Sequence, residues 1–305
     1  MHLLNIGWEY FTPESLEYFG HINFLKGGIV FSDILNTVSK QYSKEIQTQV
    51  FGCGLDGILT TRREDLYGIV NGIDYNDWNP ETDKFIPVKF SVEDTGNKAV
   101  CKKALQQAFD LPTDPGIPLV ATISRLADQK GFDLISDAME EMAALGIQYA
   151  ILGTGERKYH DLLTELSKKY PGVFSVKIAY DNALAHLIEA GADLFLMPSQ
   201  YEPCGLNQLY SLKYGTVPVV RGVGGLEDTI IDYSTFPQTG TGFKFYEYTK
   251  EAMLDAIDRA LSLYKDKKAW SNLVSRCMKE DFSWGKSARE YLELYKKAIA
   301  KHESS

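Results

Sequence analysis

The sequence predicts an α/β fold in which a parallel sheet is covered by helices on both faces, as in a doubly wound, Rossmann-like domain. Between Pro118 and Val220, short apolar runs rich in β-branched residues alternate with longer amphipathic runs. Near-continuous apolar strands that alternate with helices are typical of a parallel sheet buried on both faces. Right-handed crossover connections then place the helices on the two faces of that sheet.

The individual elements follow from the same periodicity. We predict strands at 118–124, 147–153, 173–179, 192–199 and 216–222, and helices between them at 131–146, 156–171, 182–191 and 205–215. A further helix at 98–111 precedes the first strand. The tail from 249 to 300 is helical by its spacing of apolar residues and carries no recognisable chemistry.

The first 80 residues have a different organisation. They read as helix, strand, helix and strand at 22–33, 34–39, 40–48 and 66–72, which is too few strands for a complete sheet with its own core. We therefore predict four parts: the end of an N-terminal domain at 1–80, a hinge at 81–100, a Rossmann-like domain at 101–283, and a C-terminal helix at 284–305 that packs back toward the first part.

The composition narrows the class of protein. A net charge of −9 over 305 residues argues against binding to nucleic acid or to an anionic membrane. The four cysteines are scattered, as expected for free thiols in a reducing compartment. The N-terminus lacks the basic-then-apolar pattern of a signal peptide, and no apolar run approaches the length of a membrane span. We expect a cytoplasmic protein.

The candidate binding residues follow the predicted strands, because open parallel sheets bind ligands beyond the carboxyl ends of their strands. They are Arg125 and Lys130; a Gly153-x-Gly155 turn; Tyr180; Glu202, Cys204 and Gly205; and Gly224 and Gly225. Cations neutralise phosphate charge, and glycine amides at helix N-termini donate to phosphate oxygens. Their presence along one edge therefore favours a phosphate-bearing ligand.

Several of these residues also have a simpler interpretation. The Gly153-x-Gly155 turn lacks the full GxGxxG spacing, and Glu202 taken alone is either a surface acid or a ligand contact. His186 has apolar neighbours at helical spacing, so we expect it in the core or on the surface. Cys204 has no histidine near it in sequence and is expected to be a packed thiol. Because no HxxxH, HExxH or CxxC pattern occurs, we expect no metal site.

Five segments carry a resemblance to a known family. They are "HINFLKGGIVFSDILNTVS", "YGIVNGIDYNDWNP", "SRLADQKGFDL", "MPSQYEPCGLNQLYSLKYGTVPVVRGVGGLEDTI" and "DFSW". In this order the chain closely resembles bacterial glycogen synthases and plant starch synthases. The resemblance implies the GT-B fold, with the active site between two Rossmann-like domains. It also implies transfer of glucose from ADP-glucose (UDP-glucose in some members) to the non-reducing end of an α-1,4-glucan, with retention and without a cofactor.

The resemblance also implies roles for single residues. Arg125 and Lys130 would hold the donor phosphates, and Glu202 would face the donor glucose as an orienting or electrostatic partner. The remaining implied contacts are the amides of Cys204, Gly205 and Leu206 to glucose hydroxyls; Tyr180 and the Gly153–Gly155 turn beside the nucleoside; Gly224 and Gly225 as backbone donors near the phosphates; and Asn71 reaching the sugar from the hinge side.

The chain departs from the family pattern in its first part. A Lys-x-Gly-Gly-Leu loop and an acceptor-side His-Asn motif are not found, so we expect about the first third of a typical synthase to be absent. Two hypotheses follow. The chain is a glucan synthase, acting alone or with a separate chain that supplies the missing part, or it is a nucleotide-sugar-binding half that cannot transfer glucose by itself. Another GT-B transferase, or a phosphorylase, is a third alternative.

Overall fold

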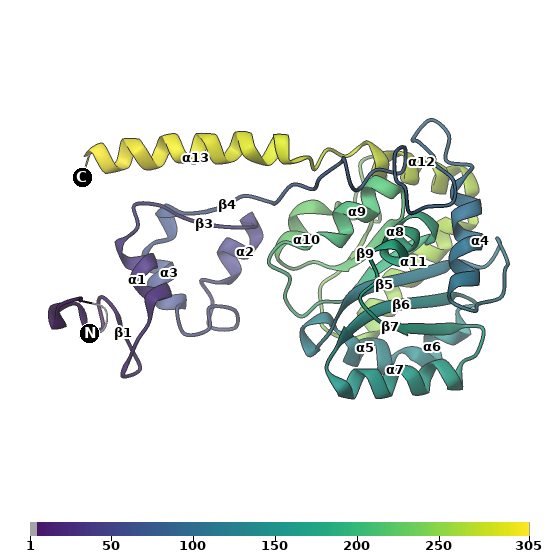
Figure 1. Ribbon diagram of the computed structural model, residues 1–305, viewed down its shortest axis with the longest axis horizontal. Coiled ribbons are helices and arrows are strands. Elements are labelled where there is room, and N and C mark those ends of the chain that lie inside the picture. The colour runs from purple at the N-terminus through teal and green to yellow at the C-terminus, as the bar shows by residue number, and fades with distance from the viewer. Residues whose placement is uncertain (1–4, 305) are drawn as a thin grey trace.

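A six-stranded parallel sheet forms the centre of the larger part of the chain in this computed structural model, which describes residues 5–304 (Figure 1). Its strands are β5 (Leu119–Leu126), β6 (Gln148–Gly155), β7 (Phe174–Ile178), β8 (Leu194–Met197), β9 (Val217–Arg221) and β10 (Phe243–Phe245). All neighbouring strands are parallel, in the order β10-β9-β8-β5-β6-β7. The strand order therefore reverses between β5 and β8, which is the topological switch point of a Rossmann sheet.

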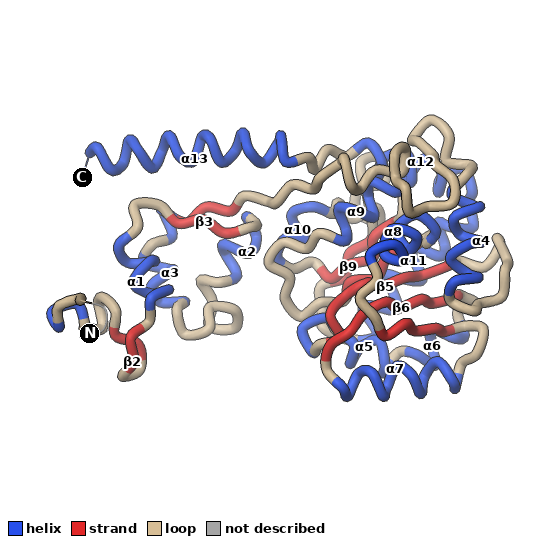
Figure 2. Tube along the Cα trace, viewed as in Figure 1, coloured by secondary structure: helices blue, strands red, loops and turns tan. Residues whose placement is uncertain are grey.

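Helices cover both faces of this sheet, as Figure 2 shows. They are α4 (Lys98–Ala108), α5 (Phe132–Asp137), α6 (Met139–Ala144), α7 (Arg157–Lys169), α8 (Asn182–Gly191), α9 (Asn207–Tyr214), α10 (Gly224–Thr229), α11 (Lys250–Lys265) and α12 (Lys267–Lys279), with the short 3-10 helix η4 (Asp128–Lys130) after β5. The predicted doubly wound fold is confirmed. The helix predicted over 131–146 divides at Ala138 into α5 and α6, and β10 is a strand that the periodicity did not indicate.

Local sequence signals explain where several helices begin and end. The side chains of Asp181, Thr249 and Asp266 accept hydrogen bonds from amides in the first turns of α8, α11 and α12. Gly215, with a φ of +67°, ends α9 in the left-handed conformation that glycine adopts without strain. No helix within residues 5–304 combines the length and apolar character needed to cross a membrane.

The front part of the molecule, residues 5–72, is small and has few strands. Its elements are η2 (Trp8–Tyr10), β1 (Glu17–Tyr18), β2 (His21–Ile22), α1 (Phe24–Phe31), β3 (Leu35–Thr37), α2 (Lys40–Glu45), α3 (Asp56–Thr61), η3 (Arg63–Asp65) and β4 (Leu66–Gly68). The strands form two separate pairs, β1 with β2 and β3 with β4. A cluster of three buried residues, Ile29, Leu55 and Leu59, forms the core of this part.

Two chain segments connect the front part to the sheet domain and run side by side. The backbone N–H of Ile73 donates to the carbonyl of Phe282 at 2.8 Å, and Ile73 bridges to Ser283. A Cβ atom at Gly72 would lie 2.4 Å from the backbone of Trp284, so only glycine permits this approach. The last helix, α13 (Trp284–Ser304), then extends along the front part (Figure 1).

Polar contacts fix α13 to the front part. Ser287 Oγ donates to the carbonyl of Val70 at 2.7 Å, and Asn36 Nδ2 donates to the hydroxyl of Tyr291 at 3.3 Å. Farther along the helix, Lys301 forms an ion pair with Asp65. The predicted parts 1–80 and 284–305 include residues 1–4 and 305, which lie outside the described residues.

The segment predicted as a hinge, 81–100, is packed onto the sheet domain. Ile86 and Phe90 belong to the main core, and α4 already begins at Lys98. Asp83 is only 4% exposed and contacts His186 Nδ1 at 2.8 Å. Just before it, the ring of Trp78 is stacked between those of His186 and Tyr210, at centroid distances of 3.8 and 3.9 Å. The crossing at Gly72–Ile73 therefore lies ahead of the segment predicted as a hinge.

We predict that Trp78→Ala destabilises the protein by about 3 kcal/mol, because the substitution removes a ring packed on both faces. Trp284→Ala, at a position that is 48% exposed, serves as the control and is expected to cost about 0.5 kcal/mol or less. Urea unfolding of the two variants measures both effects. Equal and small losses would show that the Trp78 stack does not anchor this segment.

Candidate functional site

A pocket of about 420 Å³ opens at the carboxyl ends of β5 and β8, where the strand order reverses. Parallel sheets of this order bind ligands at that point. The lining comes from four places: Val38 of the front part; Thr122, Ile123, Ser124, Arg125 and Lys130 from β5 and η4; Leu196, Met197, Pro198 and Ser199 from β8 and its end; and Glu202, Pro203, Cys204, Gly205, Leu206 and Asn207 before and at the start of α9.

The charged pair in this pocket is Lys130 and Glu202. Lys130 Nζ lies 2.5 Å from Glu202 Oε2, and the hydroxyl of Ser199 donates to the same carboxylate oxygen at 3.0 Å. Both side chains are largely buried, with 17% of Lys130 and 7% of Glu202 exposed. A buried charge is costly unless it is paired, so each of these residues holds the other in place. The sequence predicted both residues for the site, and the fold brings them together.

Unpaired backbone amides lie next to this ion pair. Cys204, Gly205 and Leu206 line the pocket, and within residues 5–304 none of their N–H groups donates a hydrogen bond. Gly205 has a φ of +70°, and a Cβ atom there would lie 2.4 Å from the side-chain oxygen of Gln208. Glycine is therefore required at this turn. Three free donors at the wall of a pocket suit a ligand that carries several hydroxyl or phosphate oxygens.

Three other predicted residues, Arg125, Asn71 and Tyr180, differ in their relation to the pocket. Arg125 lines it, and its guanidinium donates to Gln129 Oε1 at 3.2 Å. Asn71 is not among the lining residues, but its backbone lies within hydrogen-bonding reach of the Cys204 thiol. Tyr180 follows β7 and is 90% exposed, so its ring is open to solvent on the same edge of the sheet.

The predicted Gly153-x-Gly155 turn is wrong, because β6 continues through Gly155. In this extension Gly153 pairs with Ser124, and Gly155 pairs with Leu126 of β5. The two strands approach so closely that a Cβ atom at Gly153 would lie 2.1 Å from the carbonyl oxygen of Ser124. Glycine therefore serves strand pairing here, and neither glycine lines the pocket.

The amides of Gly224 and Gly225 are not free donors, in contrast to the prediction. The N–H of Gly224 donates to Glu45 Oε1 at 3.0 Å, and the N–H of Gly225 donates to the carbonyl of Glu202 at 2.9 Å. Arg221 is also engaged, since its guanidinium donates to the carbonyls of Gln200 and Tyr246. The Gly224–Gly225 turn therefore supports the backbone of Glu202.

Two residues that were weighed as alternatives have structural roles. His186 is completely buried against Asp83 and Trp78, in agreement with a core position. Cys204 is 6% exposed, and burial raises the pKa of its thiol to about 11. At neutral pH the thiol is therefore protonated, as expected of a packed cysteine.

Sequence reasoning missed several polar residues at the site, among them Ser199, Thr122 and Asn207. Ser199 contacts Glu202, and it could have been found because it stands three residues before that acid at the end of the same strand. Thr122 and Asn207 line the pocket, but they also bond to the backbone of neighbouring strands, namely to the carbonyls of Leu196 and Ile123. No pattern in the sequence distinguishes such residues from ordinary strand and helix positions.

Comparison with known proteins identifies the family. A family model described as "Glycosyl transferases group 1" matches residues 105–274, which is more than half of the chain. The chain belongs to this family. A second model, "Starch synthase catalytic domain", matches residues 1–61, in the front part.

Individual relatives of this glycosyl transferase are glycogen synthases. That of Koribacter versatilis (strain Ellin345) is 51% identical over 296 residues, which are 97% of this chain and 61% of the relative. That of Anaeromyxobacter sp. (strain Fw109-5) is 48% identical, over 97% of this chain and 62% of the relative. The predicted resemblance to glycogen and starch synthases is confirmed. The chain spans about three fifths of the length of the curated relatives that it matches.

Solved structures give the same fold. The catalytic domain of starch synthase IV from Arabidopsis thaliana, bound to ADP and acarbose, superposes with a TM-score of 0.89 at 36% identity, over 96% of this chain and 62% of that one. Sucrose-phosphate synthase from Thermosynechococcus elongatus shares the fold at 20% identity, with a TM-score of 0.59 over 88% of this chain and 59% of that one. The predicted GT-B fold is confirmed.

We predict that a single thiol of this glycosyl transferase reacts in the native state. Cys53 is exposed, whereas Cys101, Cys204 and Cys277 are buried, and burial raises the pKa of each of these three thiols. Titration with Ellman's reagent at pH 8 should give one fast equivalent in buffer and four in guanidinium chloride. The fast equivalent should be lost in Cys53→Ser. A second fast thiol that maps to Cys204 would contradict the packed role of that residue.

Proposed function

We propose that this chain carries the donor-binding side of a retaining glucosyltransferase of the glycogen and starch synthase type. The donor would be ADP-glucose and the acceptor the non-reducing end of an α-1,4-glucan. The observation that carries the proposal is the pocket at the switch point, which combines the Lys130–Glu202 pair with the free amides of Cys204, Gly205 and Leu206. The starch synthase IV structure that this chain resembles is bound to ADP and acarbose, which supports a nucleotide at this edge.

The lining suggests how the donor would be held. A diphosphate carries negative charge that Lys130 and Arg125 can neutralise. Glucose hydroxyls are matched by the three unpaired amides, with Glu202 as a charged acceptor beside them. Tyr180 offers an exposed ring at the same edge for the nucleoside. The backbone of Asn71 lies within hydrogen-bonding reach of the Cys204 thiol, next to the amides that would hold the sugar.

The difficult step of the proposed reaction is departure of the nucleoside diphosphate from the anomeric carbon. Lys130 and Arg125 would stabilise the charge that develops on the leaving phosphate, and donors of this kind contribute about 3 kcal/mol each in other enzymes. The acceptor hydroxyl oxygen forms the new bond to the anomeric carbon on the face from which the phosphate departs. Its proton passes to the leaving phosphate oxygen. Glu202 would orient the sugar and stabilise positive charge on its ring.

A second candidate function is a nucleotide-sugar-binding half that needs another chain for transfer. Exposed apolar side chains in the front part favour it: Trp8, Phe19, Phe24, Leu25, Phe31 and Val50 are each 58% exposed or more. Exposed apolar groups gathered on a part with a small core are typical of a surface that another segment covers. The partner would then carry the acceptor side. In both versions the protein would act in the cytoplasm, where its thiols stay reduced, and without a metal.

The decisive experiment incubates the purified chain with ADP-glucose and glycogen and follows ADP release, with and without EDTA. A synthase that works alone releases ADP and lengthens the glucan, equally in both buffers. The binding half binds ADP in calorimetry but shows no turnover until a chain with the remaining N-terminal part is added. Failure to bind either ADP or ADP-glucose would contradict both versions.

A further inference from the structure

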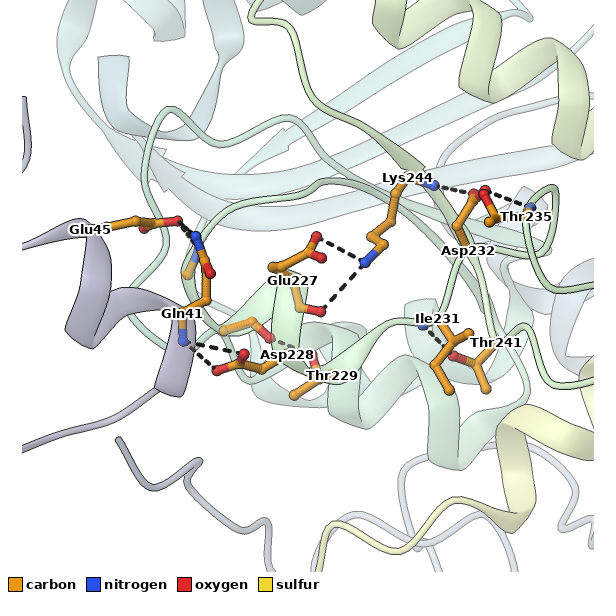
Figure 3. A network of polar contacts seen from close by, with 12 residues as sticks. Gln41, Glu45, Glu227, Asp228, Thr229, Ile231, Asp232, Thr235, Thr241 and Lys244 are labelled. Atoms are coloured by element: carbon orange, nitrogen blue, oxygen red, sulfur yellow. Dashed lines mark hydrogen bonds and ion pairs between the residues drawn. The ribbon is translucent and has the colours of Figure 1, made fainter. Parts of the chain in front are cut away.

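The contact between α2 of the front part and α10 of the sheet domain contains a buried carboxylate that the proposed mechanism does not use. Figure 3 shows Gln41 and Glu45 of α2 side by side, with Gln41 next to Asp228 of α10. Glu45 is 8% exposed, and its Oε1 accepts hydrogen bonds from the Gly224 N–H at 3.0 Å and from Gln41 Nε2 at 3.1 Å. Glu45 of the front part is therefore held by a backbone amide of the sheet domain.

The surroundings of Glu45 show why its charge is tolerated there. Burial lowers the pKa of the Arg221 guanidinium. Attraction between this cation and the nearby Glu45 carboxylate acts in the opposite direction and raises that pKa. The second oxygen, Oε2, is buried and accepts no hydrogen bond within residues 5–304. A buried carboxylate with one unpartnered oxygen is costly. The hydrogen bonds that Oε1 accepts therefore offset most of the cost of burying this carboxylate.

The Gly224 amide leads directly to the Glu202 loop. Gly224 has a φ of +47°, and a Cβ atom there would lie 2.0 Å from the carbonyl oxygen of Glu202. The next amide, that of Gly225, donates to this same carbonyl at 2.9 Å. The glycine turn and the Glu202 backbone thus touch without any intervening side chain. A shift of the turn must move Glu202, whose carboxylate pairs with Lys130 at 2.5 Å.

Hydrogen bonds from the start of α2 to Asp228 fix α2 to α10. Asp228 of α10 accepts a hydrogen bond from Ser39 Oγ at 2.6 Å and from the Gln41 N–H at 3.0 Å, at the start of α2. On the other side of α10, Glu227 pairs with Lys244 of β10 at 2.8 Å (Figure 3). Since α10 is tied to the sheet and α2 is tied to α10, the position of Glu45 is well defined.

We propose that Glu45 is a positioning residue for the donor site: from the front part it fixes the Gly224–Gly225 turn, and through that turn the backbone of Glu202. The inference rests on the proposed role of Glu202 beside the donor sugar. It makes the site dependent on both parts of the molecule, because the residue that supports Glu202 belongs to α2.

The test compares amide hydrogen exchange in the full chain for three variants. Glu45→Met keeps the buried volume but removes the acceptor, Glu45→Gln keeps an acceptor oxygen, and Lys44→Met changes an exposed neighbour on the same helix. In Glu45→Met, the peptide covering 222–227, which contains the Gly224 amide and the Gly225 amide that donates to the Glu202 carbonyl, should exchange about tenfold faster, the effect of one lost charge-assisted hydrogen bond. Exchange in α1 should stay unchanged. Glu45→Gln and Lys44→Met should both remain close to the unmodified protein.

Three results would overturn the inference: unchanged exchange at 222–227 in Glu45→Met, equal acceleration in Glu45→Gln, or acceleration that extends to α1. If Glu45→Met does not fold, Glu45→Ala replaces it in the same comparison. The readout needs no nucleotide. Failure to bind ADP-glucose would therefore contradict the proposed function, whereas the exchange result tests the support of Glu202 by Glu45 independently.

Discussion

The ion pair between Lys130 and Glu202 is the interaction around which the site is arranged. It joins the segment after β5 to the segment after β8, two strands that are adjacent only because the strand order reverses between them. Since both charges are largely buried, the pair is stable only while both segments hold their positions. Ser199, the Gly225 amide and the turn at Gly205 all serve to hold the Glu202 segment.

The front part depends on the sheet domain for its own position. Its small cluster of Ile29, Leu55 and Leu59 buries little apolar surface, so much of its support comes from α13 and from the α2–α10 contact. The crossing at Gly72–Ile73 brings both connecting segments together at one point. Since Val38 of the front part also lines the pocket, these contacts decide how the two walls of the pocket face each other.

Sequence alone predicted the strands, most helices and the edge where the pocket lies, because apolar periodicity and strand ends are local signals. It also placed Arg125, Lys130, Glu202 and Cys204–Leu206 at one site. Contacts between segments that are distant in the chain could not be predicted from these local signals. The contact of Asp83 with His186 packs the segment predicted as a hinge onto the sheet domain, and the Gly224 amide, which was expected to be free, donates to Glu45. Strand pairing likewise turned the Gly153 turn into an extension of β6.

We propose that the Lys130 ammonium is shared between Glu202 and the donor phosphates, and calorimetric titration of three variants with ADP can decide whether it is. Lys130→Ala should weaken ADP binding about tenfold, by the loss of one charge-assisted contact. Glu202→Gln should tighten it, because it frees the ammonium, and this gain should largely disappear in the double variant. An unchanged or weaker affinity for ADP in Glu202→Gln, or an equal gain without Lys130, would show that the ammonium is not shared in this way.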